Sequence, residues 1–144
     1  MANVRFNVIE GNPNDIFWDY ELVPWGRCST TEDRDKSTSV GSCLALTLYD
    51  KGQNRGVLAH LTGVICDVDF TTYTIIDEMV RKLQAGNLSV LEASVAGGIF
   101  SEKQKLFDID AVTGRLQELC IPIIGQDIGG GYSRAVFLKR DGKV

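Results

Sequence analysis

The sequence of 144 residues has no uninterrupted apolar segment of the about 20 residues that a helix needs to cross a bilayer. It also has no cluster of basic residues, because its 15 lysines and arginines are scattered and are outnumbered by 19 aspartates and glutamates. Nucleic acids and anionic membrane surfaces bind clustered positive charge, so we expect neither as a partner and no membrane insertion. The first twelve residues lack the apolar stretch of a secretory signal, which predicts a cytoplasmic protein or a delivered effector without distinguishing the two.

Residues that commonly hold metals are also scarce. His60 is the single histidine, and the four cysteines, Cys28, Cys43, Cys66 and Cys120, are far apart with no C-x-x-C pair. A four-ligand zinc site would have to be assembled from distant residues, so we expect no metal and no other cofactor. Two disulfides are the lesser alternative, since a chain of this size can bury a sufficient core without them.

The composition is that of an ordinary globular protein, with 44% hydrophobic and 24% charged residues, and predicts a single domain over residues 1–144. Alternation predicts strands and helical spacing predicts helices, in a mixed α/β domain of about seven strands and two main helices. The predicted strands are 4–9, 43–50, 57–65, 91–100 and two more around the glycines at 129–131, and residues 15–25 form either a further strand or an irregular cover. The predicted helices are 72–85, with an apolar stripe from Ile75 to Leu83, and one that begins after Asp108 as its N-cap and ends at Pro122. Residues 27–36 have six charged side chains in ten positions, which favours a solvated loop.

Cys43 and His60 are the residues best suited to chemistry. Cys43 follows the small-residue turn Val40-Gly41-Ser42, and His60 lies on the next predicted strand, which forms a hairpin with strand 43–50. A thiol near an imidazole can ionise to the nucleophilic thiolate. Free backbone N–H groups around Ser42 and Cys43 would suit an oxyanion. From the residues alone, this arrangement indicates a Cys–His enzyme, although an isolated histidine in an apolar strand is more often structural.

Four segments in order resemble the CheD family of chemoreceptor glutamine deamidases. They are VGSCLALTLYD, GVLAHL, ASVAGGIF and IIGQDIGGGYSRAVFL, between about residues 37 and 144, with a Cys-to-His spacing of seventeen. The resemblance implies an α/β fold, a layered β-sandwich with helices packed on one side, which is shared with cytotoxic necrotizing factor-like toxins. Residues 1–36 would then be a variable N-terminal region.

The resemblance also implies roles for individual residues. Cys43 would be the nucleophile, His60 the base, and Ser37 the hydroxyl residue that orients His60, because the family has a threonine six positions before its cysteine. Thr38 stands beside Ser37 and is the alternative if the alignment is shifted by one. The implied reaction is hydrolysis of a glutamine side-chain amide in a protein substrate, a chemoreceptor or another protein.

The sequence departs from the family after the Gly97-Gly98 pair, where SEKQKLFDID replaces a longer loop. Two alternatives therefore stay open: a CheD-like binding module without activity, and a thiol hydrolase of small esters or amides. Other candidates for contacting substrate or shaping turns are Thr38, Gly97, Gly98, Asp127 and Arg134. The last two flank the glycines 129–131, where no Lys-Ser/Thr follows, so a tight turn is favoured over a phosphate loop.

Overall fold

The structure is a computed structural model that describes residues 21–23, 27–32, 34–40, 43–61, 68–84, 90–97, 102–128 and 134–139. Within these ranges it contains eight strands and two helices. In chain order they are β1 (Glu21–Leu22), β2 (Cys28–Thr30), β3 (Lys36–Val40), β4 (Leu44–Asp50), β5 (Arg55–Leu61), α1 (Val68–Leu83), β6 (Leu91–Gly97), α2 (Glu102–Glu118), β7 (Ile123–Ile128) and β8 (Arg134–Leu138). The predicted strand 4–9 lies outside the described residues.

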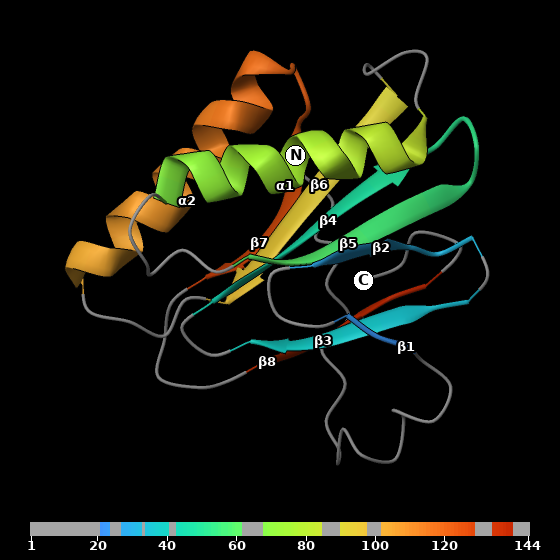
Figure 1. Cartoon of the computed structure of the whole chain (residues 1–144), viewed down its shortest axis with the longest axis horizontal. Coiled ribbons are helices and arrows are strands. Elements are labelled where there is room, and N and C mark those ends of the chain that lie inside the picture. The colour runs from blue at the N-terminus through green and yellow to red at the C-terminus, as the bar shows by residue number, and fades with distance from the viewer. Residues whose placement is uncertain are drawn as a thin grey trace.

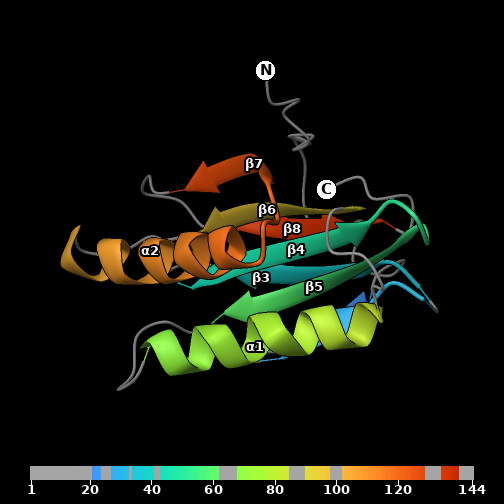
Figure 2. The ribbon, with the colours of Figure 1, turned by 90° about the horizontal axis from the view of Figure 1, so that it is seen from above.

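The elements form three layers (Figure 1). A five-stranded sheet of order β2-β5-β4-β6-β7 lies in the middle, and a three-stranded sheet of order β1-β3-β8 packs against one of its faces. Both helices cover the other face (Figure 2), where Arg115 of α2 pairs with Asp77 of α1 at 2.6 Å. The expected α/β fold, a layered β-sandwich with helices on one side, is confirmed.

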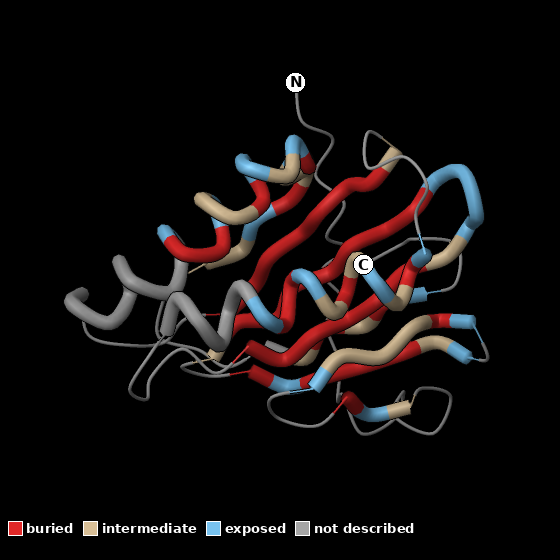
Figure 3. The backbone as a smooth tube through the Cα atoms, turned by 45° about the horizontal axis from the view of Figure 1, so that its top comes forward, coloured by how far each residue is buried: buried red, intermediate tan, exposed pale blue. Residues whose placement is uncertain are grey.

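The central hairpin separates two apolar cores. β4 and β5 are antiparallel and pair over their full lengths, and nearly all of both strands is buried, as the red tubes of Figure 3 show. Alternation sends successive side chains to opposite faces of the sheet. Leu44, Leu46 and Leu48 of β4 therefore pack under the helices, whereas Ala45 faces the three-stranded sheet. This confirms the predicted hairpin.

The helices supply the remainder of the larger core. Ile76, Met79 and Leu83 of α1 are fully buried on the stripe that the sequence predicts. In α2, Val112 and Leu116 are buried in the same cluster. Burying side chains of this size stabilises a protein by roughly 1.5–3 kcal/mol each relative to exposure.

Two sequence expectations about these elements are wrong. Residues 27–36 are not simply a solvated loop, because β2 extends the central sheet along the open edge of β5 and Lys36 is buried in β3. The second helix begins at Glu102 rather than after Asp108, which lies inside it and is not its N-cap. The segment Glu102–Phe107 is rich in Glu, Lys, Gln and Leu, residues with high helix propensity, so the helix extends toward its N-terminus.

Candidate active site

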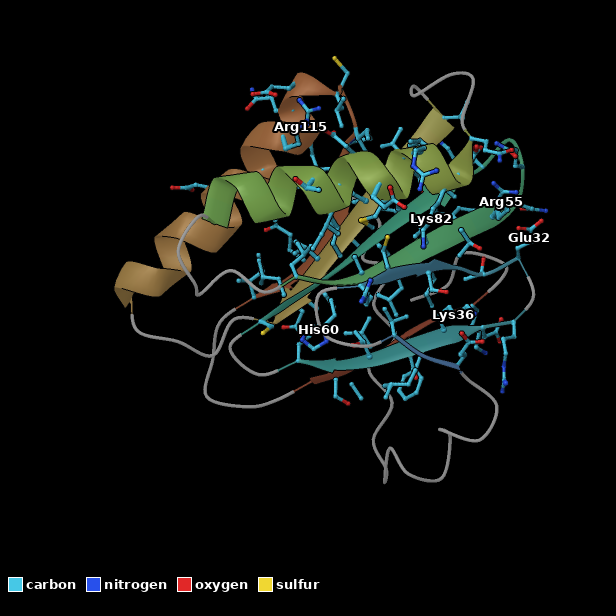
Figure 4. All side chains as sticks on the ribbon, viewed as in Figure 1. Glu32, Lys36, Arg55, His60, Lys82 and Arg115 are labelled. Carbon is cyan, nitrogen blue, oxygen red and sulfur yellow. The ribbon has the colours of Figure 1, made fainter. Side chains whose placement is uncertain are left out.

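His60 points into the space between the two sheets. It lies on β5 between Ala59 and Leu61, which both face the helix-side core, so alternation turns His60 to the opposite face. Its backbone N–H donates to the carbonyl of Arg27 at 3.0 Å, which ties this point of β5 to the start of β2. Only 9% of His60 is exposed, and Figure 4 shows its ring between β5 and β3.

Thr38 of β3 meets His60 from the other sheet. Its hydroxyl oxygen lies 2.8 Å from His60 Nδ1 and 3.0 Å from the carbonyl oxygen of Val23, and both contacts are buried. A carbonyl can only accept, so the single hydroxyl proton of Thr38 goes to Val23. Thr38 must then accept from Nδ1–H, which makes Nδ1 the protonated nitrogen and leaves the Nε2 lone pair available as a base.

The prediction that Ser37 makes this contact is wrong. Adjacent strand residues point to opposite faces, so Thr38 faces the central sheet and Ser37 faces away from it. The hydroxyl of Ser37 is buried and has no hydrogen-bond partner among the described residues. The six-residue offset from Cys43 selected the right strand but the wrong face, and Thr38, five residues before Cys43, is the neighbour of His60.

Cys43 comes directly before β4 on the same side of the sheet as His60. The register places Ala45 opposite His60, and Cys43, two residues earlier, packs like Ala45 against the core between the sheets. Diagonal neighbours of this kind have Cα atoms roughly 7–8 Å apart, within reach of a cysteine and a histidine side chain. Cys43 is half-buried and carries a thiol.

Burial sets the charge state of His60. Loss of hydration disfavours the imidazolium ion, so the pKa of His60 is lowered from its ordinary value. The ring is therefore neutral at pH 7 and can accept a proton. The same cause acts on Cys28, whose thiol pKa is raised chiefly by burial on the helix side of the sheet, opposed by the nearby Lys82 ammonium.

Gly97 allows β6 to lie against the backbone of Cys43. Its φ is +117°, a conformation that other residues rarely adopt, and a Cβ placed on it would lie 2.3 Å from the Cys43 carbonyl oxygen. The same Cβ would approach Val40 at 3.0 Å. Glycine at this position therefore shapes the backbone around the thiol.

Of the remaining predicted site residues, Asp127 is described and is not brought to His60. Asp127 of β7 is half-buried and in register with Ala96, and Ala96 is in register with Ala45. Three strand spacings therefore separate Asp127 from His60, about 14 Å in all. Arg134 opens β8 opposite Val40, but its side chain lies outside the described residues, as do Ser42 and Gly98.

Sequence reasoning did not identify Val23, the acceptor for Thr38. Its role belongs to a backbone carbonyl, which every residue has, so no residue type could have signalled it.

None of the described residues form a group of three or more His, Cys, Asp or Glu side chains that could hold a metal ion. The helices of the described chain are also too short or too polar to span a membrane.

The thiol of Cys43 and the neutral, hydroxyl-bound imidazole of His60 therefore lie on the same face of the central sheet. Two curated relatives have the name probable chemoreceptor glutamine deamidase CheD. The protein from Clostridium tetani is 31% identical over 126 residues, covering 74% of this chain and 75% of its own length. The protein from Clostridium botulinum strain Hall is 31% identical over 133 residues, covering 78% and 81%. The chain belongs to the CheD family of chemoreceptor glutamine deamidases.

The other comparisons add little. No family model matches the chain. The crystal structure of the hypothetical protein YfiH from Bacillus licheniformis superposes on 66% of the chain with a TM-score of 0.47 and 11% identity. The superposition spans 46% of that protein, a likeness too weak to establish a shared fold.

Proposed function

We propose that this protein is a glutamine deamidase that hydrolyses the side-chain amide of glutamine in a protein substrate, with Cys43 as nucleophile and His60 as base. The observation that carries the proposal is the contact of Thr38 with His60 Nδ1 at 2.8 Å, on the face where Cys43 packs. That contact leaves Nε2 free to accept the thiol proton. Membership of the family named for glutamine deamidation supports the amide substrate.

The first half of the reaction forms a thioester. His60 Nε2 takes the proton of Cys43, and the thiolate attacks the carboxamide carbon, forming a C–S bond and moving a carbonyl electron pair onto oxygen. Backbone N–H groups near Ser42 and Cys43 are the proposed donors to that oxyanion. The imidazolium then returns the proton to the amide nitrogen, the C–N bond breaks, and ammonia leaves.

The second half regenerates the thiol. His60 removes a proton from water, and the hydroxide attacks the thioester carbon. The C–S bond breaks, the substrate leaves as glutamate, and Cys43 recovers its proton from His60. The balance is one water consumed and one ammonia released, so the reaction needs no redox partner or metal.

The relatives are named for chemoreceptors, so we propose a chemoreceptor as the first substrate to test. The three described cysteines, Cys28, Cys43 and Cys120, carry thiols, which supports a reducing compartment such as the cytosol. Asp127, Gly98 and Arg134 stay as proposed substrate contacts or turn-shaping residues.

The test is incubation with chemoreceptor cytoplasmic fragments, measuring ammonia release and locating Gln-to-Glu conversions by peptide mass spectrometry. Cys43→Ala should abolish turnover, and His60→Asn should lower it about 10²- to 10⁴-fold, the usual contribution of a general base. The matched control is Cys28→Ser, since Cys28 packs in the helix-side core, and its turnover should equal that of the wild type.

The same assay separates the alternatives. Hydrolysis of small esters or amides, without conversion of any protein glutamine, would replace deamidation with a small-molecule thiol hydrolase. Stable binding of receptor fragments without ammonia release would leave an inactive binding module. Either result would overturn the proposed function.

A further inference from the structure

The short strand β1 is attached to β3 next to the site. Two backbone bonds hold it there: Glu21 N–H donates to the Asp35 carbonyl at 2.9 Å, and Val23 N–H donates to the Ser37 carbonyl at 2.7 Å. The strands are parallel, with Leu22 opposite Ser37. The segment Glu21–Val23 thus follows the part of β3 that leads into Thr38.

Side-chain contacts also hold the segment Glu21–Val23 on β3. Val23 is 1% exposed and packs in the core between the sheets, whereas Leu22, the next residue, is 59% exposed. Lys36 is buried at 1% exposure, and its ammonium lies 3.0 Å from the Glu21 carboxylate. A buried ammonium requires an opposite charge or hydrogen bonds, so this pair favours the docked position of β1. Figure 4 shows Lys36 and His60 toward opposite ends of β3, so the ion pair acts away from the imidazole.

The docked segment places one group in the site, the carbonyl of Val23. Without that carbonyl, the Thr38 hydroxyl could donate its proton to His60 Nδ1 instead of accepting from it. The ring would then carry its proton on Nε2, and no lone pair would face the thiol. With Val23 in place, the hydroxyl proton is committed to the carbonyl at 3.0 Å, and Nδ1 must be the donor.

We propose that Glu21 and Val23 are positioning residues of the active site: Glu21 holds β1 on β3, and the Val23 carbonyl sets the direction of the Thr38 hydroxyl and thereby the tautomer of His60. The inference rests on the proposed function, in which Nε2 is the base. It assigns a role to residues that the sequence places in a variable N-terminal region. It also predicts that detachment of β1 lowers turnover while Cys43, His60 and Thr38 are all present.

The tautomer can be measured directly because His60 is the chain's single histidine. Long-range ¹H–¹⁵N NMR of the full chain, labelled at histidine, shows which ring nitrogen carries the proton. The wild type should show Nδ1–H at neutral pH. Val23→Pro removes the N–H that donates to Ser37, and Glu21→Gln weakens the pair with Lys36. Both variants should increase the Nε2–H population, and kcat should fall about tenfold to a hundredfold with little change in KM.

The matched control is Leu22→Ala, on the same strand but with an exposed side chain, which should leave both the tautomer and kcat at wild-type values. Glu21→Gln changes one half-exposed carboxylate, so it keeps the test available if Val23→Pro does not fold. An Nε2–H ring in the wild type, or an unchanged tautomer and kcat in both variants, overturns the proposal. Failure of the proposed function gives a different result from failure of this inference. If the protein is not a deamidase, the wild type releases no ammonia, but Val23→Pro still changes the tautomer of His60, which supports the positioning role.

Discussion

Thr38 contacts two groups through one hydroxyl, and each contact constrains the other. The proton donated to Val23 fixes the direction of the bond with His60, so removal of the hydroxyl loses both. Ser37, one residue earlier, offers the same functional group on the opposite face of β3 and contacts neither. Substitutions at these two positions therefore show whether the location of the hydroxyl on β3, rather than the presence of a hydroxyl, matters for activity.

We expect Thr38→Val, which keeps the side-chain shape, to lower kcat by about tenfold to a hundredfold because Nε2 is no longer fixed as the base. The unpaired Val23 carbonyl should also lower the free energy of unfolding by about 1–3 kcal/mol. Thr38→Ser should retain most of the activity. Steady-state kinetics on receptor fragments, well below the unfolding temperature of each variant, is the measurement.

Ser37→Ala is the matched control, and it should leave kcat unchanged, since the serine hydroxyl is buried without a partner among the described residues. If Ser37→Ala were the damaging change and Thr38→Val were harmless, the hydrogen-bond chain described above could not be the one that acts in catalysis.

At the scale of elements, the sequence predicted what strict periodicity specifies. Alternation in 43–50 and 57–65 identified the central hairpin, and the apolar stripe of Ile75 to Leu83 identified α1. Strands β2 and β3 were missed because they are short and polar, whereas β1 lies inside the predicted segment 15–25. KSTSV has a lysine, two serines and a threonine in five positions, and four of the five are buried because the strand lies between β1 and β8 and packs against the central sheet.

The residues of the candidate site likewise fall into those that the sequence could identify and those that it could not. Cys43 and His60 could be found from the sequence because a hairpin and a family resemblance both join them. The choice between Ser37 and Thr38 depended on which face of an unrecognised strand each residue occupies. The part played by Val23 depends on a backbone atom, which sequence patterns do not describe.

The close approach of Gly97 in β6 to the backbone of Cys43 has its own test. Gly97→Ala should reduce both stability and turnover, because its φ of +117° is unfavourable for alanine and the new Cβ would meet the Cys43 carbonyl at 2.3 Å. The backbone strain alone is worth about 1–3 kcal/mol. Moving the Cys43 backbone to relieve the clash would also displace the thiol. Chemical denaturation and kinetics measure the two effects.

Gly52→Ala is the comparison, in the exposed turn between β4 and β5, where the nearest atom to a new Cβ is a side-chain oxygen of Asp50 at 3.2 Å. It should change stability less and leave kcat at the wild-type value. Equal losses of kcat in the two glycine variants would mean that Gly97 has no specific part in placing Cys43.

At the scale of the whole molecule, packing two sheets together puts His60, the proposed base, in a dehydrated layer. The helices cover one face of the central sheet, and the three-stranded sheet covers the other, so His60 is enclosed although it lies near the end of its strand. The fold therefore keeps the imidazole neutral by burial. Protonation of His60 must then oppose folding as well as catalysis.

This coupling predicts how stability depends on pH. An unfolded histidine binds a proton near pH ~6.5, whereas folded His60 has a lowered pKa and stays neutral below that value. Between the two pKa values the unfolded chain binds more protons, so the free energy of unfolding falls as pH decreases from about 6.5, by up to about 1.4 kcal/mol per pH unit, and levels off below the folded pKa. In urea denaturation from pH 8 to pH 5, the free energy of unfolding should fall more steeply in the wild type than in His60→Asn. The variant keeps every carboxylate, so the difference between the two proteins reports on His60 alone. The acid limb of kcat/KM should lie below the pKa of a free histidine for the same reason. Parallel stability curves for the two proteins would show that His60 is not held neutral by the fold.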